Sequence, residues 1–72
     1  MIKLKIKKLL DEKNKSMYWL AENTDLTYAA IYKIAKDNTE GIQFHTLDEI
    51  MLALEINDFN EIFQFVDDKN QQ

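Results

Sequence analysis

Six residues between Thr27 and Lys36 present groups suited to contacting DNA from one face of a predicted helix. They are Thr27, Tyr28, Ala29, Tyr32, Lys33 and Lys36. This face lies opposite the apolar residues Ile31 and Ile34, which stand three positions apart. Hydroxyl and ammonium groups can contact phosphates or base edges, and tyrosine rings can meet thymine methyls or the backbone. An ordinary solvent face is the alternative, but two tyrosines four residues apart make a poor one.

The surrounding stretch must position this face. Residues 16–36, SMYWLAENTDLTYAAIYKIAK, predict two short amphipathic helices joined by a tight turn. Leu20 and Ala21 belong to the first helix and Leu26 follows the turn. Two helices that cross at roughly 90–120° over such a turn approach closely. We therefore expect that a side chain larger than Ala21 would force them apart.

Hydroxyl side chains are predicted to begin both helices. Ser16 is suited to capping the first helix and Thr27 the second, because each hydroxyl can accept a hydrogen bond from a first-turn amide. The first helix is expected to end at about Asn23, and the second to reach residue 36 or 37. Residues 24–25 make the turn between them.

The amino-terminal residues carry two competing patterns. A helix is predicted over residues 3–14, with Ile6, Leu9 and Leu10 as its inward stripe. The alternation of apolar residues and lysines over residues 2–7 would also suit a strand. The adjacent leucines and the helix-forming residues after them favour the helix.

Two more helices are predicted beyond a loop at residues 38–43. The first spans residues 46–55, with Leu47, Ile50 and Leu54 facing inward. Asp58 followed by Glu61 indicates a capping box that opens a fifth helix. The apolar face of this fifth helix comprises Phe59, Ile62, Phe63 and Val66. Residues 67–72 are expected to form a polar tail.

The composition limits the kinds of site that the chain can build. Its 72 residues are enough for one small domain. With no cysteine and a single histidine, His45, we expect neither a disulfide framework nor a zinc site, and we assign His45 no function. Catalysis finds no support, because the chain lacks a nucleophile–base constellation and a glycine-rich phosphate loop. No cofactor is expected.

The absence of proline and the single glycine favour an all-helical chain. No signal peptide and no run approaching the roughly 18–20 apolar residues of a membrane span is visible, so we expect a soluble, cytoplasmic protein with no membrane partner. The arginine-free, lysine-, asparagine- and isoleucine-rich composition hints at a low-GC bacterium or its phage.

Charge is distributed unevenly along the chain. The net charge is −4, but residues 1–36 hold eight lysines against four acids, whereas residues 37–72 hold one lysine against nine acids. A basic half that carries the candidate surface and an acidic remainder are typical of a protein with one DNA-facing side. An unevenly charged solvent surface is the alternative.

The stretch SMYWLAENTDLTYAAIYKIAK resembles the helix-turn-helix of the phage-repressor (Cro/cI-type, XRE-like) family of transcriptional regulators. The opening IKLKIKKLLDEKNKSMYWLA and the segment TLDEIMLAL are similar to further helices of that family. The resemblance implies an all-α, compact five-helix bundle of the lambda-repressor-like DNA-binding type over residues 1–66. It also implies that the helix after Thr27 enters the major groove.

The resemblance carries roles onto particular residues. Ser16 and Met17 open the helix whose amino end points at a phosphate in the family, although many members have glutamine where this chain has Met17. Asp25 stands where the family usually has glycine, a position that commonly needs a positive φ. The six residues of the candidate face occupy the positions that touch bases and phosphates.

Four apolar residues are candidates for an interface: Trp19, Phe63, Phe65 and Val66. Trp19 either lies on the outward side of its helix or folds over a neighbouring helix. The other three residues either form a homodimer surface or close the core against the first helix.

The sequence thus predicts a DNA-binding transcriptional regulator, a repressor, whose partner is double-stranded DNA. Arginine is the usual bidentate reader of guanine. Because the chain has none, readout is expected to be weak, AT-leaning or dependent on DNA shape. The alternative is a protein-interaction module of a mobile element, an antirepressor or inhibitor that keeps the fold without binding an operator.

Overall fold

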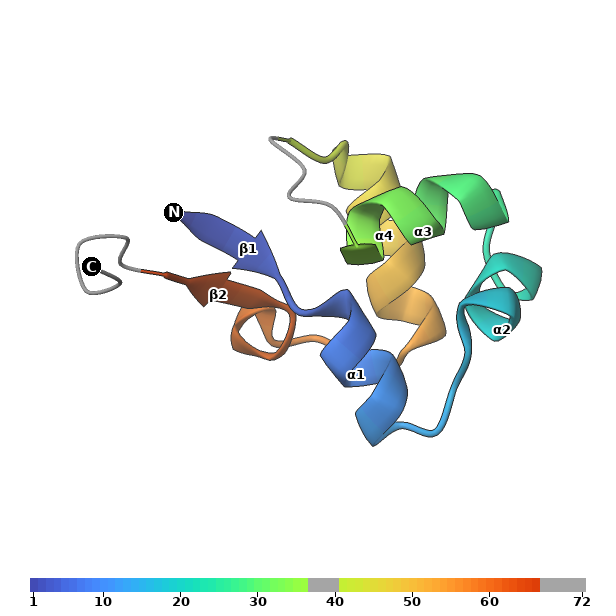
Figure 1. The fold of residues 1–72 in the computed structure, drawn as a ribbon, viewed down its shortest axis with the longest axis horizontal. Coiled ribbons are helices and arrows are strands. Elements are labelled where there is room, and N and C mark those ends of the chain that lie inside the picture. The colour runs from blue at the N-terminus through green and yellow to red at the C-terminus, as the bar shows by residue number, and fades with distance from the viewer. Residues whose placement is uncertain (37–40, 67–72) are drawn as a thin grey trace.

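The structure is a computed structural model that describes residues 1–36 and 41–66. Its elements in chain order are β1 (Ile2–Leu4), α1 (Ile6–Glu12), α2 (Met17–Glu22), α3 (Tyr28–Lys36), α4 (Phe44–Ala53), the 3-10 helix η1 (Phe59–Glu61) and β2 (Phe63–Phe65) (Figure 1). The predicted tail at 67–72 and part of the predicted loop at 38–43 lie outside the described residues. None of the helices in the described ranges is long and apolar enough to cross a membrane.

The core forms where the apolar stripes of the helices meet. The predicted inward residues of the first helix and of the helix after the loop are all buried: Ile6, Leu9, Leu10, Leu47, Ile50 and Leu54. Leu20 of α2 and Ile31 of α3 are fully buried and join the same cluster. The helical periodicity of these residues therefore predicted the core correctly.

Two helices end in a left-handed residue. Asn14, after α1, and Glu55, after α4, both have φ of 58°. The residue after each of them donates its amide hydrogen to the carbonyl five residues earlier in the chain. The Lys15 amide bonds the Leu10 carbonyl at 2.8 Å, and the Ile56 amide bonds the Met51 carbonyl at 2.9 Å. This pattern satisfies carbonyls that a helix leaves free at its last turn.

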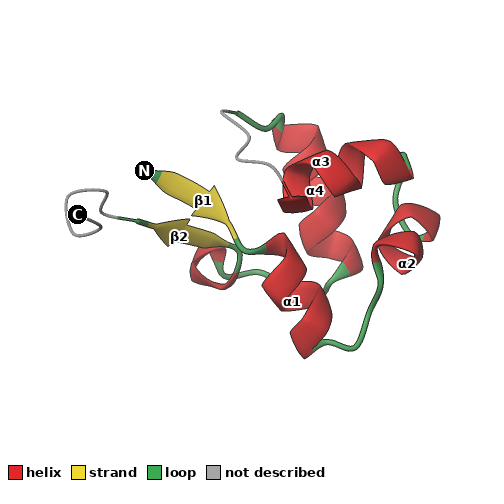
Figure 2. Ribbon diagram, viewed as in Figure 1, coloured by secondary structure: helices red, strands yellow, loops and turns green. Residues whose placement is uncertain are grey.

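A two-stranded antiparallel sheet replaces part of the predicted helical structure. β1 pairs with β2 in the register Ile2 to Phe65, Lys3 to Gln64 and Leu4 to Phe63. Figure 2 shows this sheet at one end of the molecule, opposite α2. The prediction of a helix beginning at residue 3 was wrong for residues 3–5. The competing strand pattern over residues 2–7 was correct for residues 2–4 and wrong for residues 6–7, which lie in α1. Main-chain bonding to a partner some sixty residues away decided the outcome.

The predicted fifth helix is also wrong. One 3-10 turn follows Asp58, whose side chain accepts a hydrogen bond from the Asn60 amide at 2.9 Å rather than pairing with Glu61 in a capping box. Ile62 is fully buried, and its carbonyl accepts a hydrogen bond from the Lys5 amide at 2.7 Å. The described residues therefore form four α-helices, one 3-10 helix and a small sheet, a mostly helical fold rather than an all-α five-helix bundle.

Candidate nucleic-acid interface

The side of α3 opposite the candidate DNA-contacting face packs against α2. Leu20 and Ile31 have no exposed surface, and Ala21 and Ile34 are partly buried against the same cluster. These are the residues that the motif's spacing selected for the contact between the two helices. The buried pair fixes which side of α3 turns outward.

The predicted caps set the beginning of both helices. The Ser16 hydroxyl accepts a hydrogen bond from the Trp19 amide at 3.0 Å, and the Thr27 hydroxyl accepts one from the Ala30 amide at 3.1 Å. Each cap satisfies one of the amides that lack a partner in the first turn of a helix. The first residues of α3 are thereby held in place.

The turn between the helices differs from the expectation at Asp25. Asn14 and Glu55 are the non-glycine residues with positive φ in the described part of the chain, so Asp25 is not left-handed. The Thr24 hydroxyl donates to the Leu20 carbonyl at 2.7 Å and accepts from the Leu26 amide at 3.2 Å. Because this hydroxyl closes the turn, no glycine is required there.

The candidate DNA-contacting residues lie mainly on the open side of α3. Thr27, Ala29, Tyr32, Lys33 and Lys36 are exposed, and Tyr28 is half-buried. On α2, Ser16 is exposed, but the partly buried Met17 side chain packs against the core. The Met17 side chain is therefore engaged in packing, and its contact with DNA stays a prediction.

Three tyrosines line this surface, and the sequence analysis missed one of them. Tyr18 of α2 stacks on Tyr28 of α3, with ring centroids 4.4 Å apart and planes 20° apart. The ring of Tyr28 also lies near that of Tyr32, with the two ring centroids 6.3 Å apart. Tyr18 is 66% exposed. No helical period links residues ten positions apart on different helices, so only the packing of α2 on α3 reveals this pair.

A hollow beside the tyrosines is lined by basic and hydroxyl side chains. It has a volume of about 340 Å³ and its lining includes Lys7, Lys15, Ser16, Tyr18 and Tyr28. The ammonium group of Lys7 lies 3.7 Å from Asp11, and that of Lys15 lies 4.7 Å from the centre of the Trp19 ring. The junction of α1 and α2 thus adds two lysines to this side of the molecule, of which Lys7 is paired with Asp11 in the same lining.

The predicted interface residues divide between two environments. Trp19 is partly buried and packs against the core, as the fold-over alternative required. Phe63 is partly buried and also packs on the core, which fits core closure rather than an open surface. Val66 is half-buried, whereas Phe65 is 75% exposed and pairs in register with Ile2, which is 68% exposed. An apolar strip therefore continues from the core to the outer end of the sheet.

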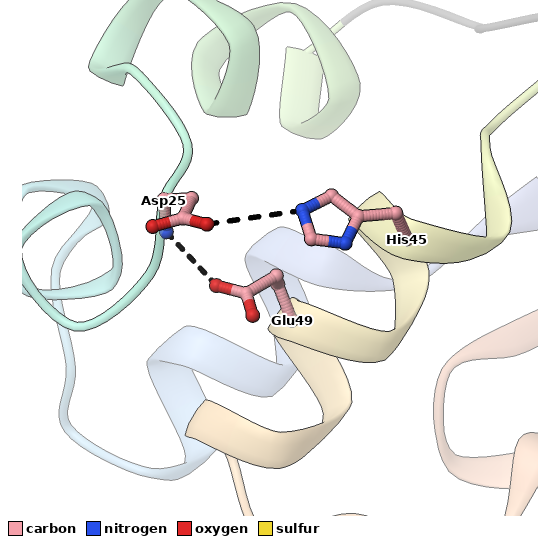
Figure 3. A group of neighbouring side chains, drawn as sticks. All are labelled: Asp25, His45 and Glu49. Atoms are coloured by element: carbon pink, nitrogen blue, oxygen red, sulfur yellow. Dashed lines mark hydrogen bonds and ion pairs between the residues drawn. The ribbon is translucent and has the colours of Figure 1, made fainter.

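A second group of polar side chains joins the turn to α4. Figure 3 shows Asp25 facing His45 and Glu49. The Asp25 carboxylate lies 3.9 Å from His45 Nε2, and the Asp25 amide donates to Glu49 Oε1 at 2.9 Å. The sequence analysis gave His45 no function and did not single out Glu49. The four-residue spacing of the two on one helix was a signal that they share a face.

Comparison with known protein families places most of the chain in one family model. The family model of the Cro/C1-type helix-turn-helix DNA-binding domain matches residues 5–68. This range includes α2 and α3, the three tyrosines Tyr18, Tyr28 and Tyr32, and α4. Searches of curated proteins and of solved structures found no match to this chain.

Proposed function

Because the chain belongs to the Cro/C1-type helix-turn-helix DNA-binding family, we propose that it is a sequence-specific transcriptional regulator that inserts α3 into the major groove. The observation that carries this proposal is the division of α3 into a buried side at Ile31 and an exposed side with Tyr32 and Lys33. An α-helix fits the major groove of B-DNA, and residues near its amino end reach base edges.

The remaining basic groups suit contacts to the DNA backbone. Lys7 and Lys15 line the hollow beside the start of α2, where Ser16 also lies. In this proposal they neutralise phosphates while α3 reads the groove. Phosphate contacts fix the register of a protein on the duplex, and base contacts specify the sequence.

The tyrosines account for the expected sequence preference. Without arginine the surface lacks the usual bidentate partner of guanine. The rings of Tyr28 and Tyr32 instead offer apolar edges that match the methyl group of thymine. We therefore propose a preference for A·T-rich sites, with part of the specificity coming from DNA shape.

Repression is the regulatory outcome that we propose, since a domain seated in the major groove of a promoter excludes other proteins from it. The site of action would be the cytoplasm, where bacterial DNA lies. The proposal includes no catalytic step.

A second copy of the chain is the partner that we propose for the outer end of the sheet. Ile2 and Phe65 form an exposed apolar pair there. To read a pseudo-palindrome, a twofold dimer formed there needs its two copies of α3 about 34 Å apart, one turn of B-DNA. Replacing Phe65 by serine should then shift the sedimentation equilibrium toward monomer. A wild-type protein that is monomeric at all concentrations would remove this part of the proposal.

DNA binding is tested by selecting duplexes from a randomised pool and measuring the affinity of the selected site by fluorescence anisotropy. Binding should weaken steeply with salt, because lysines release counterions from phosphates. Lys33→Ala should weaken binding and lower the salt slope by about one. Lys8→Ala is the matched control, because Lys8 lines a different hollow with Asn60 and Glu61.

Two results would refute the DNA-binding proposal. If Lys33→Ala and Tyr32→Ala both bind the selected site at full strength, α3 is not the reading element. If no duplex is selected even at low salt, the protein-interaction module becomes the better description.

A further inference from the structure

Three potential metal ligands converge between the helix-turn-helix turn and α4. Asp25 comes from the turn, and His45 and Glu49 come from successive turns of α4 (Figure 3). One ligand atom from each lies within 4.8 Å of the other two. The group therefore links two elements that are about twenty residues apart in the chain.

The charges of this group favour a cation. Two carboxylates face the same space, and the ion pairs found among the described residues give them no lysine partner. In the part of the chain that the structure describes, the basic group paired with them is the imidazole of His45, 3.9 Å from the Asp25 carboxylate. Glu49 uses one oxygen to hold the Asp25 amide, which leaves its second oxygen available to a ligand.

The three groups must move closer together to share a small divalent ion. Two ligand atoms on a tetrahedral Zn²⁺ lie about 3.4 Å apart, given bonds of about 2.1 Å. The Asp25–His45 separation of 3.9 Å must therefore shorten by about half an ångström, and a separation at the 4.8 Å limit of the group by about 1.4 Å. The side chains of Asp25 and His45 are 79% and 64% exposed, so rotation about their side-chain bonds is not blocked by packing.

We propose that Asp25, His45 and Glu49 bind Zn²⁺ and thereby clamp the helix-turn-helix turn to α4. The imidazole selects a borderline ion such as Zn²⁺ over Mg²⁺ and Ca²⁺, which take oxygen ligands. Water fills the remaining coordination position on the solvent side. A count of cysteine and histidine alone excludes a structural zinc finger but not this mixed site, because carboxylates also ligate Zn²⁺.

The test uses the one histidine of the chain as its reporter. Zinc chloride is titrated into the full-length, ¹⁵N-labelled protein without DNA, and the imidazole nitrogens are followed by NMR. A saturable shift of His45 Nε2 is expected with Zn²⁺ and not with Mg²⁺. In parallel, calorimetry should show the Zn²⁺ affinity falling by about tenfold or more in Asp25→Asn and in His45→Ala.

Two variants control for folding and for nonspecific binding. Glu49→Gln keeps an oxygen that can accept the Asp25 amide but loses the charge, and it should weaken Zn²⁺ binding without lowering Tm in metal-free buffer. Asp48→Asn removes an exposed carboxylate of the same helix outside the group, and its Zn²⁺ affinity should equal that of the wild type.

The outcomes separate this proposal from the one on DNA. If Zn²⁺ leaves the imidazole nitrogens unshifted, or if Asp25→Asn binds Zn²⁺ as well as Asp48→Asn does, the contact is an ion pair only. Because the titration contains no DNA, this result leaves the proposed regulator untouched. A protein that binds Zn²⁺ here but selects no duplex would refute only the regulator.

Discussion

Replacing Tyr18 and Tyr28 by alanine, singly and together, tests whether their stacked rings organise the proposed DNA-reading surface. The rings are nearly parallel with centroids 4.4 Å apart. Stacked aromatic pairs contribute about 0.5–1.5 kcal/mol beyond the area that they bury. Because Tyr18 is 66% exposed, we expect a coupling free energy in the lower half of this range, about 0.5–1 kcal/mol.

The coupling is measured as a double-mutant cycle on the free energy of unfolding in urea. Far-UV circular dichroism is the suitable signal, because Trp19 lies beside Tyr18 and its fluorescence would change with the substitution itself. Tyr18→Phe is the matched control, since it keeps the ring and removes only the hydroxyl. It should retain most of the stability that Tyr18→Ala loses.

The same cycle on DNA affinity connects the stack to function. If Tyr18 acts by orienting Tyr28, Tyr18→Ala should weaken binding about 2–5-fold, the equivalent of 0.5–1 kcal/mol, and should have little effect once Tyr28 is alanine. A coupling free energy below about 0.3 kcal/mol in unfolding would show that the rings do not stack in solution. Equal losses in both Tyr28 backgrounds would show that Tyr18 contacts DNA independently.

Two further predictions concern the packing and the backbone. Ala21→Leu should lower the free energy of unfolding by about 1–3 kcal/mol, because Ala21 packs against the core at the contact of α2 with α3; a urea midpoint equal to that of the wild type would contradict close packing there. Glu55→Gly should raise the free energy of unfolding by about 0.5–1 kcal/mol, since relief of the left-handed φ exceeds the entropic cost of glycine. Asp25→Gly is the matched contrast and should lower it, because Asp25 has no such φ; a gain at Asp25 would restore the expectation taken from the family.

The parts of the fold that follow from local spacing were predictable. The hydroxyls of Ser16 and Thr27 each accept a hydrogen bond from the amide three residues further along the chain. A hydroxyl residue directly before apolar residues at helical spacing was therefore enough to locate the start of both helices. Ile31 and Leu20 are buried because helical periodicity places them on the inward faces. The exposed side of α3, and with it most of the candidate DNA-contacting residues, followed from the same period.

The sheet and the side-chain clusters depended on contacts between residues that are far apart in the sequence. The local pattern favoured a helix from residue 3, but the pairing of residues 2–4 with residues 63–65 at the far end of the chain selected a strand. That pairing also replaced the predicted fifth helix, because backbone groups in a ladder with β1 cannot bond along a helix. Asp25 lies outside the left-handed region, and the Thr24 hydroxyl bonds both sides of the turn.

The amino-acid sequence by itself determined the two helices of the helix-turn-helix, their caps and which residues form their apolar stripes, since capping and helical periodicity relate residues no more than four positions apart. Only the tertiary structure brought Tyr18 onto Tyr28, and Asp25 onto His45 and Glu49. Side chains on different elements meet according to how the elements pack. The angle and offset of that packing are set by the whole core rather than by the spacing of residues along the chain.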